Sequence, residues 1–184
     1  MAHFQKDGLW IQGGSGLMAN VNETTPYVPG QIGKVLSAKS ADGKVPAFYQ
    51  YVQRYTTDSE TTVAGAPAYW VDFDDFIVSA ESTDSLEQPV VAGVFLGAYP
   101  AAGLYGFIQV AGLAEVNVTD TVSSGERLSI GDNDQFKALA AITITSQAVA
   151  VAVNAAVVAI AQEAVETSTN SQITAILAVM RNGW

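Results

Sequence analysis

Cysteine is missing from this 184-residue chain, and histidine occurs once, as His3. Without cysteine the chain has no disulfides, no thiolate nucleophile and no cysteine-ligated zinc or iron–sulfur site. One histidine near the start excludes three-histidine and His-Glu-x-x-His metal sites, and a Ser-His-Asp triad would have to recruit that residue. These absences predict a protein that is not an enzyme and that carries no cofactor.

Basic residues are also few, with 8 Lys and Arg against 18 Asp and Glu, which gives a net charge of -10. The first 60 residues carry five acids and five bases, so the whole excess lies in residues 61–184, with thirteen acids and three bases. An acidic surface repels phosphate backbones and anionic lipid. The charge therefore predicts that neither nucleic acid nor a membrane surface is a partner.

The start, "MAHFQKDGLWIQGGSG", has no apolar run of signal-peptide length, which predicts synthesis in the cytoplasm without export by that route. Between Lys137 and Glu163 there are twenty-five uncharged residues. Because polar residues interrupt this run and alanine contributes little transfer energy, it is interpreted as core and not as a membrane span. Alternating valines favour strands over 146–161, whereas the alanine content and the length would suit a helix.

Alternating apolar and polar residues predict strands in "GKVPAFYQYVQRY", "YGFIQVAGLAEVNV" and "SQITAILAV". Clusters of Gly, Pro, Asn and Asp separate these segments, and Asp42-Gly43 is the strongest short hairpin signal among them. Short strands with regular punctuation predict an all-β fold, namely a small antiparallel β-barrel or sandwich-like domain.

The first thirty residues have a different character. They hold "GGSG" and "TTPYVPG", with a few large apolar side chains among polar ones. This composition predicts an extended N-terminal arm over 1–30, followed by a β domain over 31–184. Such an arm needs a partner surface, and the candidate contact residues are Leu9, Trp10, Met18 and Tyr27.

Two twelve-residue stretches echo each other. "GAPAYWVDFDDF" (65–76) and "GERLSIGDNDQF" (125–136) share Gly first, Asp eighth and tenth, and Phe last. Each is interpreted as a strand, an Asp-rich turn and a return to the core, with Asp side chains accepting hydrogen bonds from backbone N–H groups two residues on. The echo also raises the possibility of two quasi-repeated halves, 31–115 and 116–184.

The same aspartates are the weak candidates for a chemical site. Asp132 and Asp134 resemble the first half of a calcium loop, but the Gly and the distal bidentate Glu of that loop are missing, so a solvated turn is favoured. Asp72 and Asp74 lie on one face of a strand, yet nothing in the sequence places them in a cleft where two carboxylates would act on a sugar.

The run from "PVVAGVFLGA" through "GFIQVAGLAEVNVTDTVSSGERLSIGDNDQFKALA" to "VVAIAQEAVETSTNSQITAILA", roughly residues 89 to 180, resembles the decoration (capsid cement) proteins of tailed bacteriophage heads. The resemblance implies a non-enzymatic, β-barrel-like homotrimer on the outer surface of the virion, with the major capsid protein as partner. The inserted "AITITSQAVAVAVNA" and the long arm depart from the compact pattern of that family. The alternative is a phage or cell-surface binding module, such as a calcium-assisted carbohydrate binder or a fibre domain.

Overall fold

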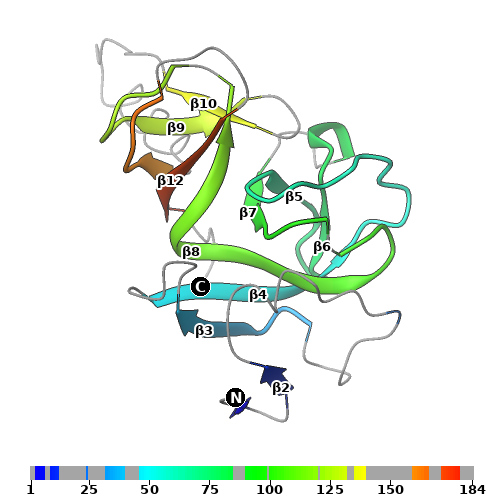
Figure 1. The fold of residues 1–184 in the computed structure, drawn as a ribbon. Helices are drawn as coiled ribbons and strands as arrows, with labels where there is room; N and C mark the ends of the chain where they lie inside the picture. Colours follow the sequence, from blue (N-terminus) through cyan, green and yellow to red (C-terminus); the bar gives the residue numbers. More distant parts are fainter. Residues whose placement is uncertain are drawn as a thin grey trace, which may run out of the picture.

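The computed structural model describes these parts of the chain: residues 3–6, 9–12, 24, 32–39, 46–84, 90–98, 100–119, 121–131, 135–139, 159–165 and 171–178. The regular elements in these ranges are strands, apart from one short 3-10 helix, η1 (Ser82–Asp84), so the expected all-β class is confirmed (Figure 1). In the same ranges no helix has the length and apolar character needed to cross a membrane.

Five strands close a first ring. In order around the ring they are β4 (Pro46–Arg54), β6 (Ile77–Ser79), β5 (Pro67–Asp72), β7 (Val91–Phe95) and β8 (Tyr105–Val118), and β8 returns to β4. The β4–β6 pair is parallel, and the other four pairs are antiparallel. Strand β3 (Val35–Lys39) pairs with β4 outside the ring, so the two strands that flank Asp42-Gly43 form the expected antiparallel pair.

Five strands also close a second ring. In order they are β8, β10 (Phe136–Ala138), β9 (Arg127–Ile130), β11 (Ala159–Ala161) and β12 (Ser171–Ala178), and β12 returns to β8. Again one pair, β8–β10, is parallel and the other four are antiparallel. The two rings share one pairing pattern when the five strands of each are numbered in chain order. In both, the first strand pairs with the third, the third with the second, the second with the fourth, the fourth with the fifth and the fifth with the first.

Strand β8 is the last strand of the first ring and the first strand of the second ring, and Figure 1 shows it bending from one ring into the other. Gly112 lies within β8 with φ of 92°, a backbone conformation that residues other than glycine rarely adopt. The register between β8 and β4 also shifts between Phe48 and Tyr49. A positive-φ glycine and a bulge are the usual devices by which one strand turns a barrel corner.

The two rings repeat the same backbone contacts at their opening glycines. Gly65 and Gly125 precede β5 and β9 with φ of 83° and 82°. The Gly65 N–H donates to the carbonyl of Phe95 at 2.9 Å, and the Gly125 N–H donates to the carbonyl of Ala161 at 2.8 Å. Both glycines therefore anchor the second strand of a ring to the end of its fourth.

The phenylalanines that close the echo are equivalent in the same way. The Phe76 carbonyl accepts from the Gln53 N–H at 3.1 Å, and the Phe136 carbonyl accepts from the Thr119 N–H at 2.9 Å. Phe136 is fully buried, whereas Phe76 is half-buried and has φ of 55°. The expectation of strand, turn and strand is confirmed for the first stretch by β5, its turn and β6; in the second stretch β9 and β10 are the two expected strands, and the turn residues 132–134 lie outside the described residues. The division into halves at residue 115 stays a prediction.

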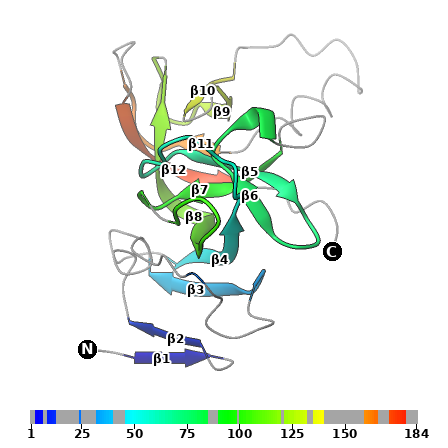
Figure 2. The ribbon, with the colours of Figure 1, turned by 90° about the vertical axis from the view of Figure 1, so that its right-hand side faces the viewer.

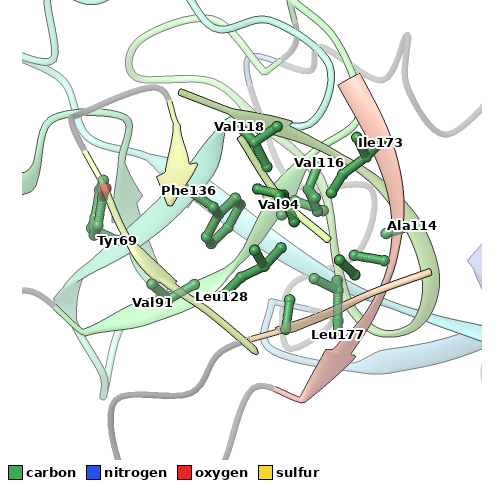
Figure 3. Packing of buried hydrophobic residues seen from close by; sticks show 14 residues of the cluster. Tyr69, Val91, Val94, Ala114, Val116, Val118, Leu128, Phe136, Ile173 and Leu177 are labelled. Atoms are coloured by element: carbon green, nitrogen blue, oxygen red, sulfur yellow. The ribbon is translucent and has the colours of Figure 1, made fainter. Parts of the chain in front are cut away.

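Each ring encloses apolar side chains, and the cluster of the second ring also takes in residues of β5 and β7 from the first. The second ring encloses a cluster that includes Val116, Leu128, Phe136 and Ile173, whose side chains point toward one another in Figure 3. The first ring encloses a cluster around Val52, Val78, Phe95 and Ile108. A third cluster, with Tyr49, Tyr51 and Phe107, lies on the other face of β4 and β8, and burial raises the pKa of Tyr49.

The sheet is mixed, in contrast to the antiparallel barrel expected from the sequence. A closed ring of five strands cannot alternate strand direction at every pair, so at least one pair must be parallel; here these pairs are β4–β6 and β8–β10. Most of the stretch 146–161, which was expected to form strands, lies outside the described residues, and its last three residues form β11.

A separate two-stranded sheet lies within the predicted N-terminal arm. Strands β1 (His3–Lys6) and β2 (Leu9–Gln12) pair antiparallel, with Lys6 opposite Leu9. In Figures 1 and 2 this hairpin lies beyond β3, at the end of the molecule away from the second ring. The assignment of 1–30 as an arm distinct from the β domain stays a prediction.

Candidate functional site

A buried ion pair lies at one end of the first ring. The Nε of Arg54, the last residue of β4, donates to Oδ2 of Asp58 at 2.8 Å, and both side chains are almost fully buried. The guanidinium also donates to the carbonyl of Pro100 at 3.2 Å and lies 5.9 Å from the ring centroid of Phe95. A further hydrogen bond reaches the Glu60 carbonyl. Arg54 therefore ties β4 to the segment after it and to the loop before β8.

The carboxylate of Asp58 is held from several directions. Its Oδ2 also accepts from the Ala80 N–H at 2.7 Å, and its Oδ1 accepts from the Glu60 N–H at 3.1 Å. Burial alone would raise the pKa of Asp58, but the hydrogen bond and charge of Arg54 and the two backbone donors outweigh burial, so the pKa is held below its ordinary value. The pair is a structural cross-link with every charge matched, not a poised acid or base.

Among the described residues there is one cluster of three carboxylates with oxygens within 4.8 Å of one another. Its members are Asp58, Glu81 and Asp84. Local donors already engage these oxygens. Ser59 donates to Glu81 through its N–H and its hydroxyl, at 3.0 and 2.7 Å, and Ser79 donates to Asp84 at 2.7 Å. Although carboxylates of this kind could hold a hard cation such as calcium, the guanidinium of Arg54 already neutralises Asp58.

The turn between β5 and β6 carries an exposed phenylalanine, Phe73, beside the half-buried Trp70 of β5. Asp72 Oδ1 accepts from the backbone N–H groups of Asp74 and Asp75 at 2.8 and 3.1 Å, which confirms the turn expected for this aspartate. Phe73 is 45% exposed, and its ring centroid lies 5.4 Å from that of Trp70. An aromatic surface with carboxylates around it is suited to contact with a partner or a sugar, and it shows no arrangement for bond cleavage.

Two of the six predicted site residues lie in a described strand, and the other four lie outside the described residues. Leu9 and Trp10 belong to β2, where the structure describes the backbone. Asp132 and Asp134, the weak calcium candidates, lie outside the described residues, and so do Met18 and Tyr27. The roles of these six residues therefore stay predictions.

Sequence reasoning did not find the Arg54–Asp58 pair. Two signals for it exist in the sequence: Arg54 shares the alternation of Val52 along β4, so it is directed to the interior, and an acid follows it four residues later. An interior arginine requires a partner because a buried charge is costly when unpaired. Together they would have indicated a buried ion pair.

Neither a protein-family model nor a curated protein matches the sequence. Among solved structures the chain is similar to the N base of head fiber gp8.5 in bacteriophage phi29, with 11% identity over 74% of this chain and 98% of that chain and a TM-score of 0.42. A likeness at this level carries no conclusion about the fold or the function of the chain.

Proposed function

We propose that the chain is a non-catalytic structural protein of a tailed-phage virion, which binds the outer surface of the assembled capsid and stabilises it. The observation that carries the proposal is the placement of the stretch that resembles capsid decoration proteins, roughly residues 89 to 180. In its described part this stretch comprises β7 to β12, so it includes the complete second ring. The resemblance therefore follows a structural unit and not a scatter of similar residues.

The physical properties of this unit suit a cement protein. A closed ring has no free strand edges, and the second ring has an interior of aliphatic and phenylalanine side chains. Neither stability nor binding in such a unit needs a thiol or a cofactor. The acidic surface favours solubility at the high local concentration of a capsid lattice.

The partner in this proposal is the major capsid protein, and the arm over 1–30 is the candidate contact. Leu9, Trp10, Met18 and Tyr27 are the apolar side chains that would offset the cost of ordering the arm on the shell. The expected assembly is a homotrimer at threefold positions of the lattice, as the family resemblance implies.

Cosedimentation with capsid shells tests the proposal. We expect the full chain to pellet with shells and a chain lacking residues 1–30 to bind at least tenfold more weakly, with the two melting temperatures within a few degrees. Trp10→Ala, with Lys6→Ala as a matched substitution in the neighbouring strand, separates loss of an apolar anchor from loss of the arm as a whole. Absence of the full chain from the pellet at micromolar concentration would reject the capsid role.

The exposed Phe73, which packs against the half-buried Trp70, supports a second candidate function, a binding module for a surface glycan. Calorimetric titration with calcium and with a panel of neutral oligosaccharides distinguishes the two. Saccharide binding that is lost in Phe73→Ala would favour the module. Calcium dependence that is lost in the double variant Asp132→Asn/Asp134→Asn would add the metal to it.

A further inference from the structure

Strand β3 is the edge strand of the main sheet in the described part of the chain. In the described part of the ten-stranded sheet, every other strand has at least two strand neighbours, while β3 pairs with β4 alone. An open edge presents unpaired N–H and C=O groups to any extended segment, and natural proteins cover or block such edges. Ser37, in the middle of β3, is exposed, so the edge is not hidden at its centre.

The β1–β2 hairpin has open edges too. Within the described residues its strands pair with each other and with no strand of the main sheet. A two-stranded hairpin is marginal by itself in water and becomes stable when a third strand or a packed surface joins it. The hairpin also lies at the same end of the molecule as β3 (Figure 2). Two incomplete edges therefore meet at one end of the fold.

We propose that the β1–β2 hairpin of one copy of the chain adds to the β3 edge of a second copy, with β2 as the strand that pairs. Charge selects β2 over β1, because β1 ends in Lys6, while Lys34 directly precedes β3 and Lys39 is its last residue. Strand β2, "LWIQ", carries no charge and places no cation beside these lysines. Main-chain hydrogen bonds would supply the affinity, as in other cases of strand addition.

A second copy is the occupant because the chain's own hairpin, although it lies near β3, forms no pair with it. Twenty-two residues separate Gln12 from Val35, which span roughly 70 Å when extended. A domain of this size has a radius of gyration of about 16 Å, so the connection reaches a neighbour. The donor surface and the acceptor surface differ, so the contact is head-to-tail. Such contacts form a closed cyclic oligomer when the rotation between copies allows it. A trimer of this kind would fit the proposed function but does not depend on it.

The absence of cysteine makes a direct test simple. One variant carries Ser37→Cys in the acceptor strand, and the donors carry Ile11→Cys or Gln12→Cys, because neighbouring residues of a strand face opposite sides and one of the two faces Ser37. Each donor is coexpressed with the acceptor variant and treated with mild oxidant. We expect a disulfide-linked pair that contains one chain of each kind. As a control, the acceptor cysteine is moved to Ser123, an exposed serine that precedes β9. With Ser123→Cys in place of Ser37→Cys, the disulfide-linked pair should not form.

The outcomes separate the alternatives. If neither donor variant forms a disulfide with the Ser37→Cys variant, the proposal is wrong. Light scattering gives a second readout: deletion of residues 1–12, and separately Ser37→Pro, should convert the assembly to monomers with the far-ultraviolet circular dichroism of the rings retained. Linked chains that do not pellet with capsid shells would reject the capsid role and leave the strand exchange standing.

Discussion

The two rings have the same order of strand pairing but different interiors. At the equivalent ends of their fourth strands the first ring has Phe95 and the second has Ala161. The guanidinium of Arg54 lies over Phe95 and pairs with Asp58 at one end of the first ring, whereas the cluster that the second ring encloses is aliphatic and aromatic. Turns and strand pairing therefore set the architecture here, and a ring with an apolar interior can carry a buried ion pair at one end or lack one among its described residues.

The largest expected effect removes the feature that distinguishes the first ring. Arg54→Ala leaves Asp58 buried without its cation, and such a change costs about 3–5 kcal/mol of unfolding free energy. Urea denaturation measures it, with Lys137→Ala at an exposed lysine of β10 as the control, where we expect about 0.5 kcal/mol or less. Equal losses in the two variants would mean that the ion pair contributes nothing specific to the first ring.

Next in size is a cavity in the second ring. Leu128 is fully buried among Val116, Phe136 and Ile173, so Leu128→Ala should cost about 3 kcal/mol. Ile176→Ala, on β12 with 42% of the residue exposed, is the matched control and should cost less than about 1 kcal/mol. Since β8 belongs to both rings, we expect the two rings to unfold in one cooperative transition, whose free energy falls in Leu128→Ala. Two separate transitions would show that the rings unfold independently.

A pair of glycines with the same φ gives a smaller but sharper comparison. A Cβ at Gly65 would lie 2.9 Å from the backbone nitrogen of Asn117 in β8, whereas a Cβ at Gly125 has no atom within 4 Å. Gly125→Ala therefore carries only the backbone cost of about 1 kcal/mol, and Gly65→Ala adds a clash, for about 2–3 kcal/mol in total. Thermal unfolding of the two variants tests this order, and equal losses would contradict the close contact at β8.

The smallest expected effect is in the dependence of stability on pH. Because the folded pKa of Asp58 lies below the ordinary 3.8, its contribution is complete above that value and is lost as the pH falls through the folded pKa. Free energies of unfolding measured between pH 6 and pH 2 should fall more steeply for the wild type than for Asp58→Asn in the acid range. Parallel curves would show that this carboxylate is not the source of the difference.

Local signals in the sequence predicted much of the architecture. Alternation located β4, β8 and β12, and each of the two echoing stretches contains the strand that was expected in it, β5 and β9. Asp72 forms the turn that its type and position predicted. These features depend on a few neighbouring residues, so they can be recognised without knowledge of the rest of the chain.

Contacts between distant segments were not predictable in the same way. The parallel pairs β4–β6 and β8–β10 arise from ring closure, and no local pattern states which strand will close a barrel. The bond from Arg54 to the carbonyl of Pro100 joins residues 46 positions apart. The calcium candidates Asp132 and Asp134 lie outside the described residues, so the sequence prediction for them is unchanged.

The shared strand also sets an order of events on the ribosome. The first ring has all its strands once Val118 has left the exit tunnel, but the second half of β8 then waits for β12, which begins at Ser171. At about 5–20 residues per second this interval lasts roughly 3–10 s. During this interval the nascent chain carries a folded first ring, and the second half of β8 exposes an unpaired strand edge that is rich in valine. A ribosome-bound chaperone or a neighbouring nascent chain can bind this edge before β12 does.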